Sequence, residues 1–139
     1  MIKVVTTDYV SDAARMIREA VFINEQKFTI EFDDIDAKAI CMVLYEDETP
    51  MACCRYFKGN EEGEYVVGRL AVRQEYRGQH LGERMLQEVE QAVRNVGGKK
   101  LSLSAQVRVQ GFYEKQGFVK YGDLYYDEYC EHIHMEKLL

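Results

Sequence analysis

The chain has 139 residues and carries 24 acidic against 18 basic side chains, giving a formal net charge of −6. This length suffices for one domain with a hydrophobic core and is too short for two, so we expect a single domain over residues 1–139. Hydrophobic residues make up 47% and charged residues 30%, as in water-soluble globular proteins. The acidic balance argues against nucleic acid or an anionic membrane as the partner, because both bind basic surfaces.

Targeting signals and cysteine chemistry point to the cytoplasm. No apolar run approaches membrane-spanning length, and the first residues do not form a signal-peptide pattern. The four cysteines include the neighbours Cys53 and Cys54, which would point to opposite faces of a strand and so fit neither a disulfide framework nor a zinc site. We therefore expect a cytoplasmic protein.

The first part of the chain predicts strands at residues 2–6, 39–45 and 51–57. The last two would form a hairpin, because the segment between them is polar and holds the only proline. Between the first and second strands lies a helix with apolar positions at Val10, Ala14, Ile17 and Val21 and with Thr7, Asp8 or Ser11 as its cap.

An acidic segment, residues 31–36, follows this helix. One interpretation is a solvated run of charges. The other is a negatively charged lip that attracts a cationic substrate.

Residues 66–82 are the stretch around which the rest of the chain is organised. Val66 to Val72 is short, apolar and β-branched, which predicts a buried strand. A polar turn with two glycines follows, and from Leu81 apolar residues recur at helical spacing up to Gly97-Gly98. Such a turn leaves backbone N–H groups unpaired at the helix start, which favours an anion such as phosphate. Many strand–turn–helix units of this kind bind nothing, so the motif alone leaves both interpretations open.

The second part of the chain predicts a strand at 100–105, a short helix at 107–116, and strands at 118–121 and 130–137 joined by an acidic, tyrosine-rich loop at 122–128. Hairpins come first and crossover helices later. This order predicts an α/β (α+β) fold with a mixed, mostly antiparallel central sheet flanked by helices on both faces.

Several side chains could carry chemistry. Tyr113 lies on the short helix, where an aromatic residue is more often part of the core, although a phenol near a pocket can donate a proton. Cys130, His132 and His134 alternate along one strand and so share a face. No fourth ligand follows at a recognisable spacing, and we therefore expect no metal.

Two motifs in register resemble the GNAT N-acetyltransferase superfamily. Residues 76–82 resemble its acyl-CoA-binding segment, Arg/Gln-x-x-Gly-x-Gly/Ala, with Arg77 and Gly82 at the ends of the pattern. Residues 112–118, Phe-Tyr-Glu-Lys-Gln-Gly-Phe, resemble its second motif. Residues 21–26, 68–72 and 132–135 look like the ElaA/YjcF-like branch, so the resemblance covers nearly the whole chain.

The sequence departs from the superfamily pattern at two positions. His80 replaces the middle glycine of the turn, which is costly only if the backbone there has a positive φ. Gln106 replaces an asparagine that commonly precedes the short helix, so the amide is kept and its reach changes.

The resemblance implies an acetyl-CoA-dependent N-acetyltransferase that acts on a small primary amine. The resemblance also implies that the amine attacks the thioester directly, that the pyrophosphate binds the amides of residues 77–82, and that the pantetheine pairs with residues 70–72. Tyr113 would protonate the leaving thiolate, with Glu64 and Glu25 as the first candidates for the base and His132 behind them. The implied cofactor-binding residues are Leu70, Ala71, Val72, Arg77, Gly78, Gln79, His80, Leu81, Gly82, Gln106, Phe112, Tyr113 and Lys115, and the implied substrate-binding residues are Phe22, Glu25, Gln26, Arg69 and His132.

Two other interpretations remain. One is a non-catalytic acyl-CoA-binding or sensing module with the same fold, and the other is a metal-binding domain built on Cys130, His132 and His134. The acceptor site would lie in the loops at 25–36 and 122–128. The sequence does not name the amine, and a homodimer stays open.

Overall fold

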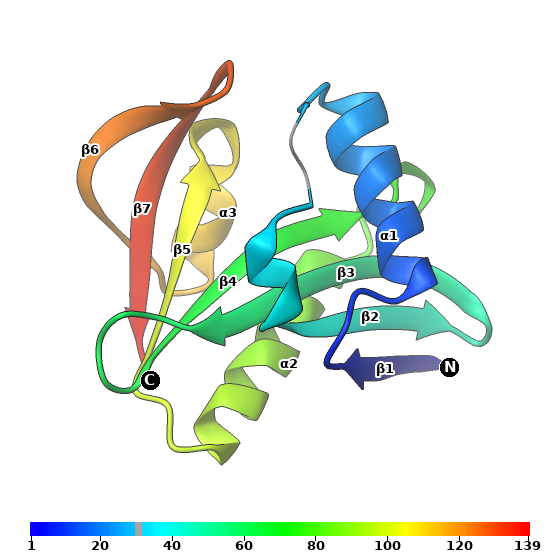
Figure 1. Ribbon diagram of the computed structural model, residues 1–139, viewed down its shortest axis with the longest axis horizontal. Helices are drawn as coiled ribbons and strands as arrows, with labels where there is room; N and C mark the ends of the chain where they lie inside the picture. The colour runs from blue at the N-terminus through cyan, green and yellow to red at the C-terminus, as the bar shows by residue number, and fades with distance from the viewer. Residues whose placement is uncertain (30–31) are drawn as a thin grey trace. The chain divides into compact units, whose positions relative to one another are not determined.

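The computed structural model describes residues 1–29 and 32–139 and divides into two compact units. The first unit comprises Met1–Phe57 and Val67–Val89, and the second comprises Lys58–Val66 and Glu90–Leu139. One strand and one helix contribute residues to both units (Figure 1). The prediction of a single domain over residues 1–139 stays a prediction.

The described residues form seven strands, three α-helices and four short helical turns. The strands are β1 (Ile2–Thr7), β2 (Ile40–Glu46), β3 (Thr49–Lys58), β4 (Glu64–Val72), β5 (Lys100–Gln106), β6 (Val119–Asp127) and β7 (Cys130–Leu138). The α-helices are α1 (Asp12–Arg18), α2 (Leu81–Asn95) and α3 (Gln110–Lys115). The short turns are η1 (Glu19–Glu25), which is π-helical, and the 3₁₀ turns η2 (Asp34–Ala37), η3 (Gln74–Tyr76) and η4 (Val107–Val109).

The strands of the first unit follow the order β1-β2-β3-β4, with β1/β2 and β2/β3 antiparallel. The predicted hairpin is confirmed, although Pro50 lies within β3 rather than in the turn. It pairs with Tyr45 beside a register shift, where a missing N–H donor is tolerated. Helix α1 packs against β2, and Figure 1 shows α1 in front of β2 to β4 and the start of α2 behind them.

Helix α1 begins where its sequence provides a cap. Ser11 has an extended backbone, and its hydroxyl accepts a hydrogen bond from the N–H of Ala14 at 3.2 Å. The helix then continues into η1, whose wider π-helical turns end at Glu25. Of the predicted apolar stripe, Ala14, Ile17 and Val21 are buried, together with Phe22. Val10 precedes the helix and is partly exposed.

The strands of the second unit follow the order β4-β5-β7-β6, and β5/β7 and β7/β6 are antiparallel. Helix α3 packs against β5 and β6. Apolar residues at alternate positions of β5 and β7 form the core of this unit, and Ser102 of β5 is buried as well. Leu101, Leu103, Ala105, Ile133 and Met135 are each at most 4% exposed.

The segment after Tyr121 differs from the sequence prediction. The sequence predicts a loop at residues 122–128, whereas β6 runs without interruption from Val119 to Asp127. Gly122, with φ of 81°, lies in a register shift after Tyr121, and the pairing with β7 resumes at Tyr125. Every residue of β6 is exposed. A strand without a buried face lacks the alternating pattern by which strands are recognised, which is why the sequence suggests a loop.

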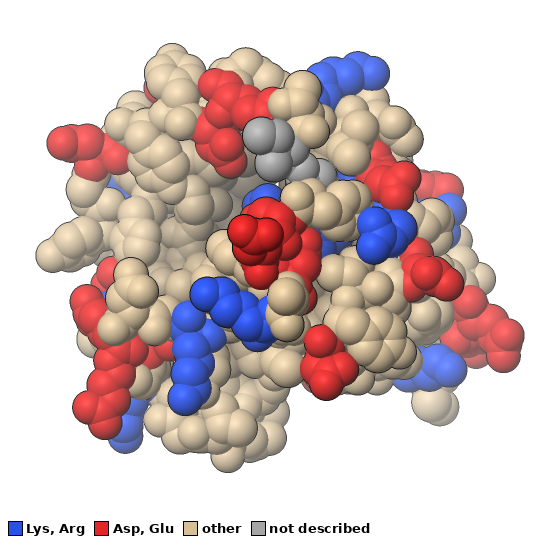
Figure 2. Space-filling model, in the orientation of Figure 1, with Lys and Arg blue, Asp and Glu red and all other residues tan. Residues whose placement is uncertain are grey.

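Charge is distributed rather than gathered on the face that Figure 2 displays. There, Asp and Glu side chains are interspersed with Lys and Arg. None of the described helices is both long enough and apolar enough to span a membrane.

Candidate functional site

The connection from β4 to α2 has the strand–turn–helix form that the sequence predicted. Strand β4 ends at Val72, the 3₁₀ turn η3 follows, and α2 begins at Leu81. Between them, Gly78 has φ of 83° and His80 has φ of 61°. The left-handed backbone at residue 80 explains why a glycine suits this position, and His80 carries a strain of about 1 kcal/mol there.

The start of α2 is suited to bind an anion. The first helical N–H groups have no intrahelical acceptor, and the helix dipole adds positive potential there. Turns with left-handed residues bring successive N–H groups to one side. The His80 side chain is 86% exposed, and its Nδ1 lies 3.4 Å from Oε2 of Glu83. The Leu81 side chain is buried and anchors the helix, whereas Gly78 and Gln79 are exposed. This arrangement fits a phosphate or pyrophosphate group.

The Arg77 side chain folds back from the turn to two other segments. Its Nε donates to the carbonyl oxygen of Val72 at 3.0 Å. Its two terminal nitrogens donate to the two carboxylate oxygens of Glu25 at 2.6 and 2.7 Å. The hydrogen bonds to Glu25 raise the pKa of Arg77 above its ordinary value. Glu25, predicted as a base, is therefore one partner of a bidentate ion pair.

Strand β4 is irregular just before the residues expected to pair with pantetheine. Arg69 has φ of 51° inside the strand, a conformation that breaks the regular alternation of side chains. Its NH2 nitrogen donates to Asp33 at 3.2 Å. Of the next three residues, Ala71 is buried and Leu70 and Val72 are partly exposed.

Two carboxylates of the acidic segment are embedded in a network of arginines. Asp36 accepts from Arg18 at 2.8 and 3.1 Å and from Arg55 at 2.9 Å. Asp33 accepts from Arg55 at 2.6 and 3.0 Å. Arg18 and Arg55 are at most 5% exposed. The interpretation of residues 31–36 as a negatively charged lip is thus corrected for Asp33 and Asp36, because arginines neutralise both. Asp34 is exposed, and Glu31 lies outside the described residues.

The network holds both carboxylates in their ionised form. Hydrogen bonds from Arg55 lower the pKa of Asp33 below its ordinary value. Burial alone would raise the pKa of Asp36, but the hydrogen bonds from Arg18 and Arg55 outweigh it and lower the pKa to about 2. Both aspartates therefore stabilise the fold at neutral pH.

In the second unit, Tyr113 lies on α3 and is partly exposed. Its ring makes edge-to-face contacts with Phe112, at 5.1 Å between ring centroids, and with Phe118, at 5.9 Å. Phe118 is buried. These edge-to-face contacts fix the orientation of the Tyr113 ring. Phe112 is partly exposed, and Lys115 is exposed at the end of the helix.

Strand pairing brings Gln106 and His132 together, because they are directly opposite each other on β5 and β7. Oε1 of Gln106 accepts from Nε of Arg108 at 2.9 Å. His132 is only 6% exposed, and its Nδ1 lies 3.0 Å from the carbonyl oxygen of Cys130. The Tyr125 ring stacks on His132 at 6.0 Å, and the Tyr125 hydroxyl is hydrogen-bonded to Ser104. Tyr125 is a further candidate for the substrate-binding residues, because it stacks on His132. The sequence pattern around it indicates a loop and gives no sign of this contact.

Glu64, the other predicted base, is the first residue of β4, whereas Leu70 to Val72 close the strand. Its carboxylate accepts from Ser102 Oγ at 2.8 Å and from the backbone N–H of Glu61 at 3.2 Å. Burial would raise the pKa of Glu64, but these hydrogen bonds lower it below the ordinary value. A carboxylate held as an anion by fixed donors is a weak base, so the geometry favours a structural role.

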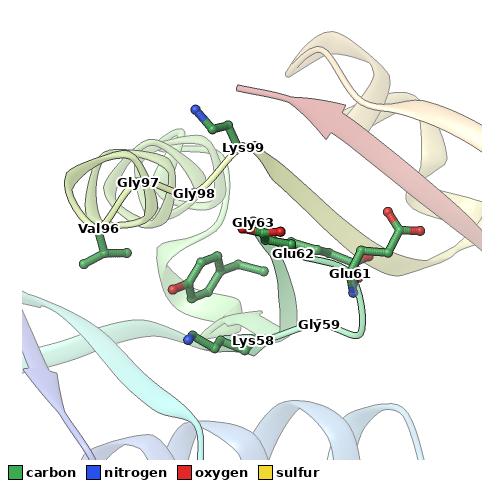
Figure 3. Close-up of a pocket in the computed structure, with 11 residues that line it drawn as sticks. Lys58, Gly59, Glu61, Glu62, Gly63, Val96, Gly97, Gly98 and Lys99 are labelled. Atoms are coloured by element: carbon green, nitrogen blue, oxygen red, sulfur yellow. Dashed lines mark hydrogen bonds between the residues drawn. The ribbon is translucent and has the colours of Figure 1, made fainter.

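Glu64 also lines a pocket of about 430 Å³ in the second unit. Figure 3 shows this pocket between the turn at Gly59 to Gly63 and the segment Val96 to Gly98, which follows α2. Its charged lining is already paired in part, since Glu61 contacts Lys100 at 2.8 Å. We assign no ligand to it.

The remaining predicted residues are placed as follows. Phe22 is buried at 8% exposure, and Gln26 caps the end of η1. Within residues 1–29 and 32–139, no three His, Cys, Asp or Glu side chains are grouped as a metal site. His134 lies 2.8 Å from Glu136, and the Cys130 thiol contacts the carbonyl of Glu131.

The protein has the fold of the acyl-CoA N-acyltransferases, as two solved structures show. A solved putative N-acetyltransferase from Lactobacillus plantarum superimposes with a TM-score of 0.90 at 25% identity, over 99% of this chain and 98% of that one. An acyl-CoA N-acyltransferase from Pseudomonas aeruginosa gives a TM-score of 0.86 at 26% identity over 99% of both chains.

The family follows from the sequence match. The model of the acetyltransferase (GNAT) domain matches residues 5–139, and the chain belongs to that family. Protein ElaA of Escherichia coli strain K12 is 27% identical over 130 residues, which are 90% of this chain and 85% of ElaA. The predicted family and fold class are thereby confirmed.

Proposed function

We propose that the protein is a cytoplasmic acetyl-CoA-dependent N-acetyltransferase that acetylates a small primary amine. The observation that carries the proposal is the turn before α2, where Gly78 and His80 adopt left-handed backbone immediately before the first turn of the helix. That donor set fits a pyrophosphate. All four cysteines are free thiols, in keeping with a reducing compartment.

In this proposal the residues of β4 and the turn bind the cofactor. In the proposed complex the amides of residues 78–82 hold the pyrophosphate, and the backbone of Leu70 to Val72 pairs with the pantetheine. The thioester supplies an electrophilic carbonyl that a neutral amine attacks. The chain contributes orientation of that carbonyl relative to the amine, which lowers the barrier of a direct transfer.

Tyr113 is proposed to donate its phenolic proton to the leaving thiolate. A phenol with a pKa of ~10 that protonates a thiolate whose acid has a pKa of ~8.5 works uphill by about 2 kcal/mol. Tyr113 therefore assists late in thiol expulsion. Because Glu25 and Glu64 are both engaged by donors, we propose that water takes the proton from the substrate ammonium before the neutral amine attacks the thioester.

The experiment is an assay of free thiol release from acetyl-CoA with a panel of small amines. Turnover with any amine, with the acetylated product identified by mass, supports the proposal. The assay should be repeated with propionyl-CoA and longer acyl thioesters as donors, because the proposal also specifies the acetyl group. Absence of turnover across the panel would contradict it.

The engagement of both candidate bases also favours a second function, a non-catalytic acyl-CoA-binding module. This module would bind CoA with an affinity measurable by calorimetry and would turn over none of the amines. The assay and the binding measurement therefore separate the two functions.

A further inference from the structure

The three-way contact of Arg77 is the feature from which we draw a further inference. The Arg77 guanidinium links the turn to the carbonyl of Val72, the last residue of β4, and to Glu25, the last residue of η1. Glu25 and Arg77 are 52 residues apart in the sequence. We propose that Arg77 and Glu25 form a clamp that holds the turn 77–82 in the conformation that receives the cofactor's pyrophosphate. This inference rests on the proposed function.

The geometry favours a positioning role over direct contact with phosphate. Three of the guanidinium donors are directed at Val72 and Glu25, so the charged group is turned toward the strand and η1. The pair is bidentate and short, and bidentate geometry fixes orientation as well as distance. A backbone nest binds an anion only while its N–H groups stay aligned, so a residue that holds the turn acts on affinity without touching the ligand.

The same geometry changes the role of Glu25. Both of its carboxylate oxygens accept from Arg77. As the anchor of the clamp, Glu25 must be an acceptor but need not take up a proton during catalysis. The variant Glu25→Gln can therefore keep this role, because its amide oxygen still accepts from Arg77, whereas Glu25→Ala cannot.

The clamp contributes little to global stability. The two side chains are 40% and 37% exposed, and ion pairs with such exposure contribute at most about 1 kcal/mol to the stability of a fold. We therefore expect Glu25→Ala and Arg77→Ala to stay folded, which thermal unfolding would verify. Their effect on the turn can then be measured separately.

The test is a double-mutant cycle on CoA affinity by calorimetry, with no amine present. Arg77→Ala and Glu25→Ala should each weaken CoA by roughly tenfold, and the double variant should bind no more weakly than either single variant. Glu25→Gln should stay within about threefold of the wild type. The matched control is Glu75→Ala, which removes an exposed carboxylate paired with Arg73 in the same connection and should leave affinity unchanged.

Kinetics add a readout that a merely structural defect would not reproduce. With an accepted amine, Arg77→Ala and Glu25→Ala should raise KM for acetyl-CoA while kcat changes little, and Glu25→Gln should keep the pH profile of the wild type. A kcat defect confined to Glu25→Gln and Glu25→Ala, with an altered pH profile, would make Glu25 a base. Additive losses in the cycle, or tighter CoA binding by Glu25→Ala, would overturn the clamp.

Hydrogen exchange separates failure of the clamp from failure of the proposed function. If the wild type binds no CoA, the proposed function fails, but amide exchange in residues 78–82 still tests the clamp without ligand. Exchange there should be faster, and equally so, in Glu25→Ala and Arg77→Ala, and unchanged in Glu75→Ala. Unchanged exchange in all three variants would refute the clamp.

Discussion

Replacement of Asp36 by asparagine tests the arginine network most directly. Asp36→Asn keeps the size of the side chain and one acceptor oxygen but removes the charge that faces Arg18 and Arg55. The Asp36 side chain is 12% exposed, and those of Arg18 and Arg55 are 3% and 6% exposed. Solvent therefore screens these charges weakly. Arg55 keeps its hydrogen bonds to Asp33, whereas the charged hydrogen bonds between Arg18 and Asp36 are lost.

The magnitude follows from the pKa of Asp36, which is lowered from 3.8 to about 2. At 1.36 kcal/mol per unit, ionised Asp36 stabilises the fold by about 2 kcal/mol at pH 7. Removing one partner of a buried pair costs about 3–5 kcal/mol in other proteins. Because asparagine still accepts a hydrogen bond, as a protonated aspartate would, we expect a loss near the lower figure, about 2–3 kcal/mol.

The assay is thermal unfolding as a function of pH. With an unfolding entropy of about 2.1 cal/mol/K per residue, a loss of 2–3 kcal/mol lowers Tm by about 7–10 °C at pH 7. Because the folded-state pKa of Asp36 is depressed, its contribution is complete well above pH 3.8 and is lost as pH falls toward 2. The difference between wild type and Asp36→Asn should therefore shrink to about 1 kcal/mol at pH 3.

The control is Asp34→Asn, in the same 3₁₀ turn, where the side chain is exposed. It should change stability by no more than about 0.5 kcal/mol. Equal shifts in Tm for Asp36→Asn and Asp34→Asn would refute the reasoning, as would a difference from wild type that does not depend on pH.

Three further predictions concern the proposed cofactor site. Gly82→Glu introduces a negative side chain at the second residue of α2, and calorimetry should show CoA affinity reduced well over tenfold with the fold intact. His80→Gly relieves the strain of φ at 61° but adds freedom to the unfolded chain, so stability should change by at most about 1 kcal/mol, and CoA affinity, measured alongside, by a few-fold. Tyr113→Phe should leave CoA binding unchanged and lower kcat on the order of 10²-fold. Steady-state kinetics should show that defect shrinking for an acyl thioester with a more acidic thiol. Equal defects for both leaving groups would mean that Tyr113 only positions the cofactor.

The sequence by itself determined the elements whose signals are local. The apolar run at Val66 to Val72, the glycine-containing turn and the helical stripe from Leu81 each occupy a few consecutive residues. They were found where the pattern predicted them. For residue 80 the sequence supplied only a condition, that a side chain is costly there if φ is positive. The structure shows that this condition is met, because His80 has φ of 61°.

Only the tertiary structure decided which charges meet. Glu25 joins Arg77 across 52 residues, and Asp33 joins Arg69 across 36. No periodicity in the sequence records such pairs, so Glu25 and Glu64 could be proposed as free bases and residues 31–36 as an exposed lip. The strand β6 was missed for a related reason. Its conformation is set by pairing with β7, and the hydrogen bonds of that pairing leave no pattern in side chains that are exposed throughout.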